Sequence, residues 1–184
     1  DSEYRNEYDN FVNVFGELSN LRGIDIAPYS NDRVYGEYFP ESRIIVLYGV
    51  GGKNGSKFMT QVAETERSMG QWSTSSKYHA LRHELGHALQ TEHELNDKNW
   101  QKKLDEINEL RKSLNNKLTG LNENDIIKVA KKTLSKYGVV DRSEFISESI
   151  AEYINNPDKA RPTSRKVVEI IMRGDGYYVS STAG

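Results

Sequence analysis

Residues 83–87 read His-Glu-Leu-Gly-His, which is an H-E-x-x-H pattern. On an α-helix, side chains four residues apart project from one face and lie about 6 Å apart along the axis. Two imidazoles placed in this way, those of His83 and His87, can bind one metal ion, and the carboxylate of Glu84 can reach a water molecule held by that ion. The pattern therefore predicts a metal site with a general base beside it.

The residues around the pattern have the spacing of an amphipathic helix, which we expect over residues 76–93. Its apolar side chains fall on the side opposite to the two histidines: Tyr78, Leu81, Leu85, Ala88 and Leu89. The alternative is a chance match in which both histidines are solvated. The chain has only four histidines, so finding two of them in one pattern favours the metal site.

Composition narrows the class of protein. The chain has 184 residues, enough for a hydrophobic core, so we expect a single domain over residues 1–184 and a monomer. Its net charge of −2 gives no electrostatic reason to expect nucleic acid or an anionic membrane as a partner. No apolar run approaches the length of a membrane span. Because the chain has no cysteine, any zinc ion must be bound by histidines and carboxylates.

Residue spacing predicts a mostly helical α+β domain with a small mixed β-sheet in its N-terminal half. Strands are expected at 24–29, 33–39 and 43–50, and the last two form a hairpin. Helices are expected at 2–20, 56–68, 76–93, 97–118, 123–137, 142–155 and 163–173. Ser56 is a candidate cap for the second helix, and Gly138 is well placed to end the fifth. The tail after Gly174 is expected to be loose.

A catalytic zinc ion usually takes three protein ligands and leaves one position for water. His93 is one candidate for the third ligand, because it stands where the metzincin pattern H-E-x-x-H-x-x-G-x-x-H has its last histidine. That pattern requires a helix break at its glycine, but here the position holds Gln90, a good helix former. If the helix continues, His93 lies about 9 Å beyond His87 along the axis and cannot reach the same ion. We therefore interpret His93 as an exposed histidine near the helix end.

Glu144 is the second candidate for the third ligand. It shares one face of the predicted helix 142–155 with Glu148, four residues later. One carboxylate can bind the metal while the other, a turn away, orients a histidine ligand. The alternative is that Glu144 completes a capping box with Asp141 and that Glu148 is solvated. The residues alone leave these two interpretations open.

Three motifs taken together resemble one family. The stretches at 83–87, 137–138 and 144–148 read His-Glu-Leu-Gly-His, Tyr-Gly and Glu-Phe-Ile-Ser-Glu. They resemble the catalytic domain of anthrax lethal factor and the related Pro-Pro endopeptidases, which are zincins of the gluzincin type. The family often has Phe and Ala where this chain has Ile and Ser in the third motif. The resemblance covers about residues 77–155.

The resemblance implies a zinc metalloendopeptidase acting on proteins or peptides. One Zn²⁺ would be bound by His83, His87 and Glu144, with Glu148 supporting the site from behind the ligands. Glu84 would take a proton from the zinc-bound water and deliver it to the leaving amine. Tyr137 would donate a hydrogen bond to the developing oxyanion or to the amine.

Three weaker expectations concern the surroundings of the site. A strand of the 33–50 hairpin is expected to pair with an extended substrate, and the glycine-rich stretch 49–55 to border the cleft as a flap. His79, one turn before His83, is interpreted as a surface histidine beside the site.

Two alternatives remain open. One is a catalytically inactive, zincin-like structural or binding module of a phage or toxin protein; the presence of Glu84 argues against it, because such a module has no need of a general base. The other is a metzincin-like peptidase that uses His93. The chain begins at Asp1 and has no signal-like segment, so we expect a processed chain or a module of a longer protein. Domains of this type resemble modules of larger secreted or phage-encoded proteins, which slightly favours a secreted or virion-associated location.

Overall fold

The computed structural model describes residues 2–29 and 33–174. Its elements in chain order are α1 (Ser2–Phe15), β1 (Gly23–Ala27), β2 (Gly36–Phe39), β3 (Ile44–Tyr48), α2 (Gly55–Ser68), α3 (His79–Asn96), α4 (Trp100–Leu118), α5 (Glu123–Thr133), η1 (Tyr137–Val139), α6 (Arg142–Asn155), η2 (Pro157–Lys159) and α7 (Pro162–Met172). This confirms the prediction of a mostly helical α+β chain with a small mixed sheet in its N-terminal half.

The sheet has three strands in the order β1-β3-β2. The central strand β3 pairs in parallel with β1 and antiparallel with β2, so the hairpin predicted over residues 33–50 is confirmed. Ile45 and Leu47 alternate along β3 and are fully buried, as expected of a strand with one face on the core. Strand β2 lies at the edge of the sheet, on the side next to α3.

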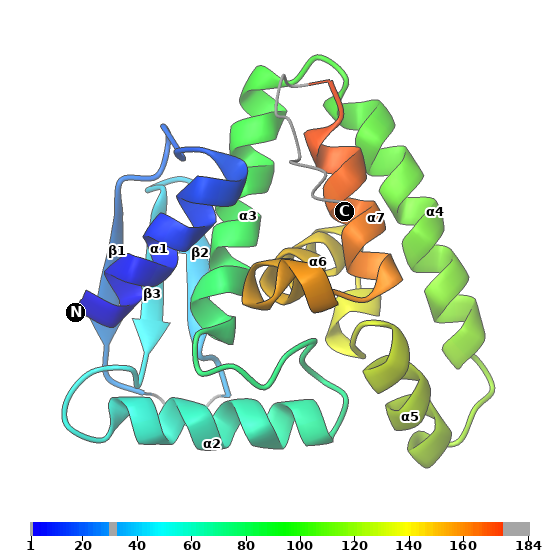
Figure 1. Cartoon of the computed structure of the whole chain (residues 1–184), viewed down its shortest axis with the longest axis horizontal. Coiled ribbons are helices and arrows are strands. Elements are labelled where there is room, and N and C mark those ends of the chain that lie inside the picture. Colours follow the sequence, from blue (N-terminus) through cyan, green and yellow to red (C-terminus); the bar gives the residue numbers. More distant parts are fainter. Residues whose placement is uncertain (1, 30–32, 175–184) are drawn as a thin grey trace.

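Helix α3 stands between the sheet and the cluster formed by α4, α5, α6 and α7, while α2 runs across the lower end of the sheet (Figure 1). Because α3 has neighbours on both sides, its residues 79–89 are buried nearly all round. The predicted apolar back holds Leu81 and Leu85, which are fully buried. His83 and Glu84 on the predicted polar front are buried as well, since that front packs on α6 and β2.

Helix α3 begins and ends three residues later than predicted, at His79 and Asn96. Side chains before it accept backbone N–H groups and form turns: Ser76 N–H donates to Thr74 Oγ1 at 3.3 Å, and Tyr78 N–H to Ser76 Oγ at 3.2 Å. These local hydrogen bonds compete with the first helical turn.

Other predicted helix ends are also wrong. The helix predicted over residues 2–20 ends at Phe15, because Gly16 after it has a φ of 84°. The helix predicted to begin at residue 97 begins at Trp100.

The cap of α2 is Asn54 rather than Ser56, and the helix starts at Gly55, where a Cβ would lie 2.1 Å from the carbonyl oxygen of Val50. The helix predicted to run to residue 137 ends at Thr133. Beyond it, the N–H groups of Lys136 and Tyr137 donate to the carbonyls of residues 70 and 71, at 2.7 and 3.3 Å.

Among residues 2–29 and 33–174, none of the helices combines the length and the apolar character needed to cross a bilayer. The tail after Gly174, which the sequence led us to expect loose, lies outside the described residues.

Candidate metal centre

The site depends on a close crossing of α3 and α6. At Gly86, the glycine of the H-E-L-G-H stretch, a Cβ would lie 2.8 Å from Cα of Ser147 on α6. A side chain there would therefore collide with the backbone of the other helix. Gln90, one turn later, donates to the carbonyl of Ser143 at 3.1 Å and to Ser147 Oγ at 3.2 Å. The two helices are thus held together where both carry metal-binding residue types.

This crossing brings three donor atoms together. Nε2 of His83 lies 2.8 Å from Oε2 of Glu144 and 3.2 Å from Nε2 of His87, and the third side of the triangle, from His87 Nε2 to Glu144 Oε2, is 3.4 Å. Zinc binds such atoms at about 2.0–2.2 Å in a tetrahedron, whose edges are then about 3.3–3.6 Å. The donor triad formed by His83, His87 and Glu144 therefore has the chemistry and nearly the spacing of a zinc site.

The charges of the triad also fit a cation. His83 has a carboxylate at each ring nitrogen, Glu144 at Nε2 and Glu148 at Nδ1. Burial lowers its pKa, but the hydrogen bonds to both carboxylates prevail and raise the pKa to about 10. Burial raises the pKa of Glu144, yet the hydrogen bonds and charges of His83 and His87 bring it well below its ordinary value. A proton on Nε2 of His83 can hold these atoms together, and a metal ion can replace it.

Each histidine of the triad has a partner at its other ring nitrogen. Nδ1 of His83 lies 3.0 Å from Oε1 of Glu148, and Nδ1 of His87 lies 3.0 Å from the hydroxyl of Ser143. Such partners fix the ring orientation and the tautomer of a ligating histidine. Glu148 is fully buried, so the alternative of a solvated Glu148 is wrong.

The capping interpretation of Glu144 is half right. Its backbone N–H donates to the side chain of Asp141 at 2.9 Å, which caps α6. The carboxylate of Glu144 points to His83 and His87, so it does not take part in the cap.

His79 is not a surface residue, and that expectation is corrected. It is 1% exposed; its Nε2 lies 2.8 Å from Oε1 of Glu148 and its Nδ1 lies 3.0 Å from the hydroxyl of Thr74. The reason is that the front of α3 packs on α6 and on the segment around residue 73, so a histidine one turn before His83 is covered.

A second group of side chains, His79, His83 and Glu148, also has donor atoms close enough together for a metal ion. Here one carboxylate oxygen faces both rings at 2.8 and 3.0 Å, which is the arrangement of two N–H donors on one acceptor. All three side chains are buried. The donor triad with Glu144 borders a cleft, and it is the better candidate for a metal that a substrate must reach.

Glu84, the candidate base, lies between α3 and the edge strand β2. A Cβ at Gly36 would be 2.9 Å from Cγ of Glu84, so the glycine permits this close approach. Burial raises the pKa of Glu84, opposed by the charges of His83 and His87 and by a hydrogen bond from the backbone N–H of Tyr38. A carboxylate with a raised pKa can exchange a proton nearer to neutral pH.

Tyr137 reaches the donor triad from the short turn η1. Its hydroxyl donates to Oε1 of Glu144 at 3.0 Å. Burial raises its pKa, and the charge of Glu144 adds to the effect, so the phenol stays protonated and can donate a hydrogen bond.

His93 lies away from the donor triad. Helix α3 continues through Gln90 to Asn96, and this is the condition under which His93 is expected not to reach the ion. The ring of His93 stacks on Trp100, with centroids 5.0 Å apart, and its Nδ1 lies 3.6 Å from Asp97. The side chain is 12% exposed, so describing it as an exposed histidine is wrong, because α4 begins beside it.

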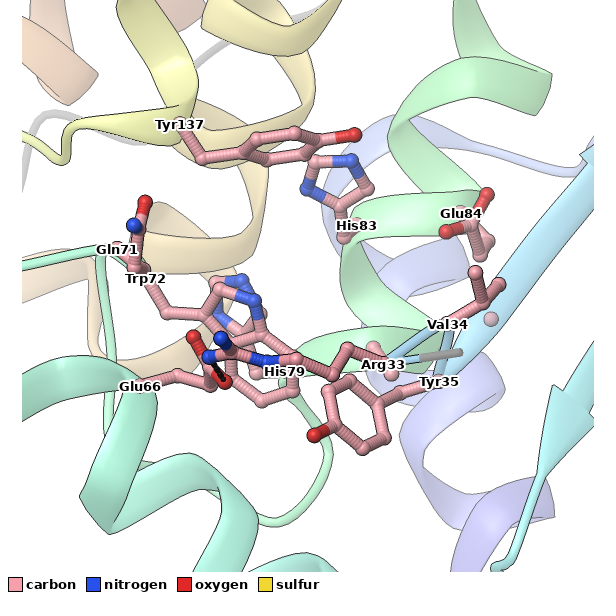
Figure 2. Close-up of a pocket in the computed structure, with 12 residues that line it drawn as sticks. Arg33, Val34, Tyr35, Glu66, Gln71, Trp72, His79, His83, Glu84 and Tyr137 are labelled. Atoms are coloured by element: carbon pink, nitrogen blue, oxygen red, sulfur yellow. Dashed lines mark hydrogen bonds and ion pairs between the residues drawn. The ribbon is translucent and has the colours of Figure 1, made fainter. Parts of the chain in front are cut away.

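Two cavities meet at the site. A cleft of about 890 Å³ is bordered by β2, α3, α4 and the start of α6, and a smaller cavity of about 270 Å³ lies toward Trp72 and Glu66. His83, Glu84 and Tyr137 line both. Figure 2 places these three side chains at one end of the smaller cavity and the ion pair of Arg33 with Glu66 at the other. The glycine-rich stretch 49–55, expected as a flap, lines neither cavity.

Comparisons with protein-family models, with curated proteins and with solved structures found no match for this chain. The geometry of the donor triad and of the residues around it is therefore the evidence for a function.

Sequence reasoning did not find several residues of the site. These are Gly36, Thr74, His79 and Ser143, together with Ser73, whose backbone N–H donates to Glu148 Oε2 at 2.6 Å. A signal was present for His79 alone, which continues the four-residue spacing of His83 and His87.

Proposed function

We propose that this chain is a zinc-dependent endopeptidase with a zincin-like site of the lethal-factor type. One observation carries the proposal: three metal-binding atoms of His83, His87 and Glu144 lie 2.8 to 3.4 Å apart at a cleft. Glu84 and Tyr137, the two further residues that the family resemblance implies, line the same cleft.

Zinc, when bound by the donor triad, supplies a Lewis acid that polarises the substrate carbonyl and makes a coordinated water more acidic. Glu84 accepts a proton from the attacking water and passes it to the leaving amine. The phenol of Tyr137 donates a hydrogen bond to the oxygen or nitrogen on which charge changes during the reaction. Glu148 and Ser143 hold the two histidine rings in place.

The edge strand β2 is the proposed guide for an extended substrate. It borders the cleft through Gly36, Glu37 and Tyr38, and the backbone N–H of Tyr38 already points to Glu84. A peptide that adds to this edge gains main-chain hydrogen bonds. Because His83, Glu84 and Tyr137 line both cavities, the scissile bond would lie between a side chain in the cleft and one in the smaller cavity.

Zinc content per chain tests the metal site. We expect about one zinc in the wild type and in His93→Ala, and a loss of zinc from Glu144→Ala. Loss of zinc from His93→Ala with retention in Glu144→Ala would favour the metzincin-like alternative. A wild type that binds no zinc at neutral pH would exclude the enzyme.

Hydrolysis of a peptide library tests the activity. Glu84→Gln keeps the size and a hydrogen-bonding group, so we expect it to bind zinc like the wild type and to lose about 10²–10⁴-fold in rate. A wild type that binds zinc but cleaves no peptide at a rate above Glu84→Gln is the outcome expected of a non-catalytic zincin-like module.

A further inference from the structure

His79 is held rigidly in the interior of the molecule. Its ring lies beside the side chain of Trp72 (Figure 2). The two rings are stacked, with centroids 4.3 Å apart and planes inclined by 17°. With this face covered, the two ring nitrogens point in fixed directions, Nε2 to Glu148 and Nδ1 to Thr74. Neither the metal site nor the proposed chemistry described above uses this histidine.

Glu148 connects His79 to the donor triad. Its Oε1 lies 2.8 Å from Nε2 of His79 and 3.0 Å from Nδ1 of His83, and its Oε2 accepts the backbone N–H of Ser73 at 2.6 Å. The carboxylate is fully buried. A carboxylate with three donors cannot rotate without breaking at least one bond, so its orientation is set by His79 and Ser73 as much as by His83.

The hydrogen-bond pattern assigns the protons. The carboxylate of Glu148 can only accept, so His79 carries its proton on Nε2, the nitrogen that faces Glu148. Nδ1 of the neutral ring then accepts the hydroxyl proton of Thr74, whose oxygen accepts the N–H of Ser76. Glu148 in turn accepts Nδ1–H of His83, so when a metal ion replaces the proton on Nε2 of His83, the lone pair of this nitrogen of the donor triad faces the ion.

The choice of histidine has an electrostatic reason. A zinc ion brings two positive charges, which the carboxylates of Glu144 and Glu148 match. A neutral imidazole at position 79 donates to Glu148 without cancelling its charge, whereas a lysine or arginine would cancel it. The negative charge of Glu148 therefore remains available to make His83 a stronger ligand.

We propose that His79 is a positioning residue of the zinc site: its Nε2–H holds Glu148 in the orientation in which Glu148 fixes the Nδ1–H tautomer of His83. This inference rests on the proposed function, because it assigns His79 to the support of that same metal site.

Three variants separate positioning from packing. His79→Phe keeps an aromatic ring to stack on Trp72 and removes both nitrogens. His79→Gln restores one N–H donor toward Glu148. Thr74→Val removes the hydroxyl that is hydrogen-bonded to Nδ1 of His79. Ser164→Ala is the matched control, because the hydroxyl of Ser164 donates at 2.5 Å to the buried carboxylate of Glu152, one turn beyond Glu148 on α6.

The experiment compares zinc affinity, by competition with a chromophoric chelator, with thermal unfolding of the zinc-free chain. We expect His79→Phe to weaken zinc binding by about 10- to 100-fold, His79→Gln to recover part of the loss, and Thr74→Val to show a smaller loss. Ser164→Ala should lower the unfolding midpoint and leave zinc affinity unchanged. If His79→Phe does not fold, the comparison of His79→Gln and Thr74→Val with Ser164→Ala still tests the proposal.

The proposal is overturned if the folded His79 and Thr74 variants bind zinc as the wild type does and differ only in their unfolding midpoints. If the variants behave in this way while the wild type binds zinc and cleaves peptides, the proposed function still holds. A wild type without zinc affinity removes both proposals.

A second readout tests the protons directly. The chain has four histidines, so long-range ¹H–¹⁵N spectra of the ¹⁵N-histidine-labelled, zinc-loaded protein contain few signals. We expect the proton of His79 on Nε2 and that of His83 on Nδ1. A proton of His79 on Nδ1 contradicts the proposal.

Discussion

At the residue scale, the hydroxyl and the ring of Tyr137 have different contacts, so their contributions to the site can be measured separately. The hydroxyl lies 3.0 Å from Oε1 of Glu144, whereas the ring lies beside that of His83, with centroids 5.6 Å apart. Tyr137→Phe removes only the hydroxyl. We expect kcat to fall by about 10²–10³-fold, as for the loss of one donor to a developing charge, with zinc affinity changed by a few-fold at most.

The control for Tyr137→Phe is Tyr48→Phe, which also removes a hydroxyl bonded to a carboxylate, that of Glu37 at 3.0 Å. Tyr48 lines neither cavity, so its loss should not change kcat. Equal kcat values for both variants and the wild type would show that Tyr137 only packs at the end of its turn.

Gly36 is a second test at this scale. A Cβ there would lie 2.9 Å from Cγ and 3.2 Å from Oε1 of Glu84. Because these atoms belong to a side chain, Gly36→Ala should displace the base and leave the backbone in place. A displacement of about 1 Å can cost about 10²-fold in rate, so we expect kcat/KM to fall by about 10- to 100-fold at normal zinc content.

Gly23→Ala on strand β1 is the control for Gly36→Ala, since a Cβ at Gly23 meets no atom within 4 Å. A Gly36→Ala variant as active as the wild type would mean that Glu84 tolerates displacement and that β2 does not position it.

At the element scale, the crossing of α3 and α6 determines whether the donor triad exists. Gly86→Ala would place a Cβ 2.8 Å from the Cα of Ser147, and backbone cannot yield as a side chain does. We expect a loss of about 1–3 kcal/mol in the free energy of unfolding, the usual cost of overpacking. Zinc affinity should fall as well, because α3 carries two of the proposed ligands and α6 the third.

Denaturant unfolding of the zinc-free chain and chelator competition measure the two effects of Gly86→Ala separately. A variant that is destabilised but binds zinc as the wild type does would show that the helices can separate without separating the ligands.

The sequence predicted these two helices better than their surroundings. The four-residue spacing of His83 with His87, and of Glu144 with Glu148, places each pair on one helix face whatever lies opposite. Such spacing does not say what covers that face. The spacing therefore predicts a surface position for His79, whereas its side chain is buried against Trp72 and Glu148.

Helix ends were predicted less well where tertiary hydrogen bonds decide them. Residues 134–137, which follow the end of α5 at Thr133, include none that forbids a helix. The helix ends because the N–H groups of Lys136 and Tyr137 find acceptors at residues 70 and 71, 65 or more positions earlier in the chain. The same bonds bring Tyr137 to the cleft, so a prediction of the site from helical spacing alone could not place it.

At the scale of the whole molecule, two buried histidines should give the zinc-free chain a stability optimum in pH. Hydrogen bonds to Glu144 and Glu148 raise the pKa of His83 to about 10, so its contribution is complete below about pH 6.5 and is lost as the pH rises toward 10. Burial lowers the pKa of His79, so stability is lost as the pH falls below about 6.5, where the unfolded chain takes up the proton. The stability of the zinc-free chain should therefore be highest near pH 6.5 and fall on both the acid and the alkaline side.

Bound zinc should remove the loss of stability on the alkaline side of this profile. Binding displaces the proton from Nε2 of His83, so zinc affinity rises with pH between about 6.5 and 10, by up to about tenfold per unit for one proton. Thermal unfolding at several pH values, with zinc and with EDTA, measures both effects, and calorimetry in two buffers counts the protons released. A zinc-free profile that stays flat above pH 6.5, or zinc binding without proton release, would mean that His83 is already neutral in the zinc-free chain and that no proton links its Nε2 to Glu144.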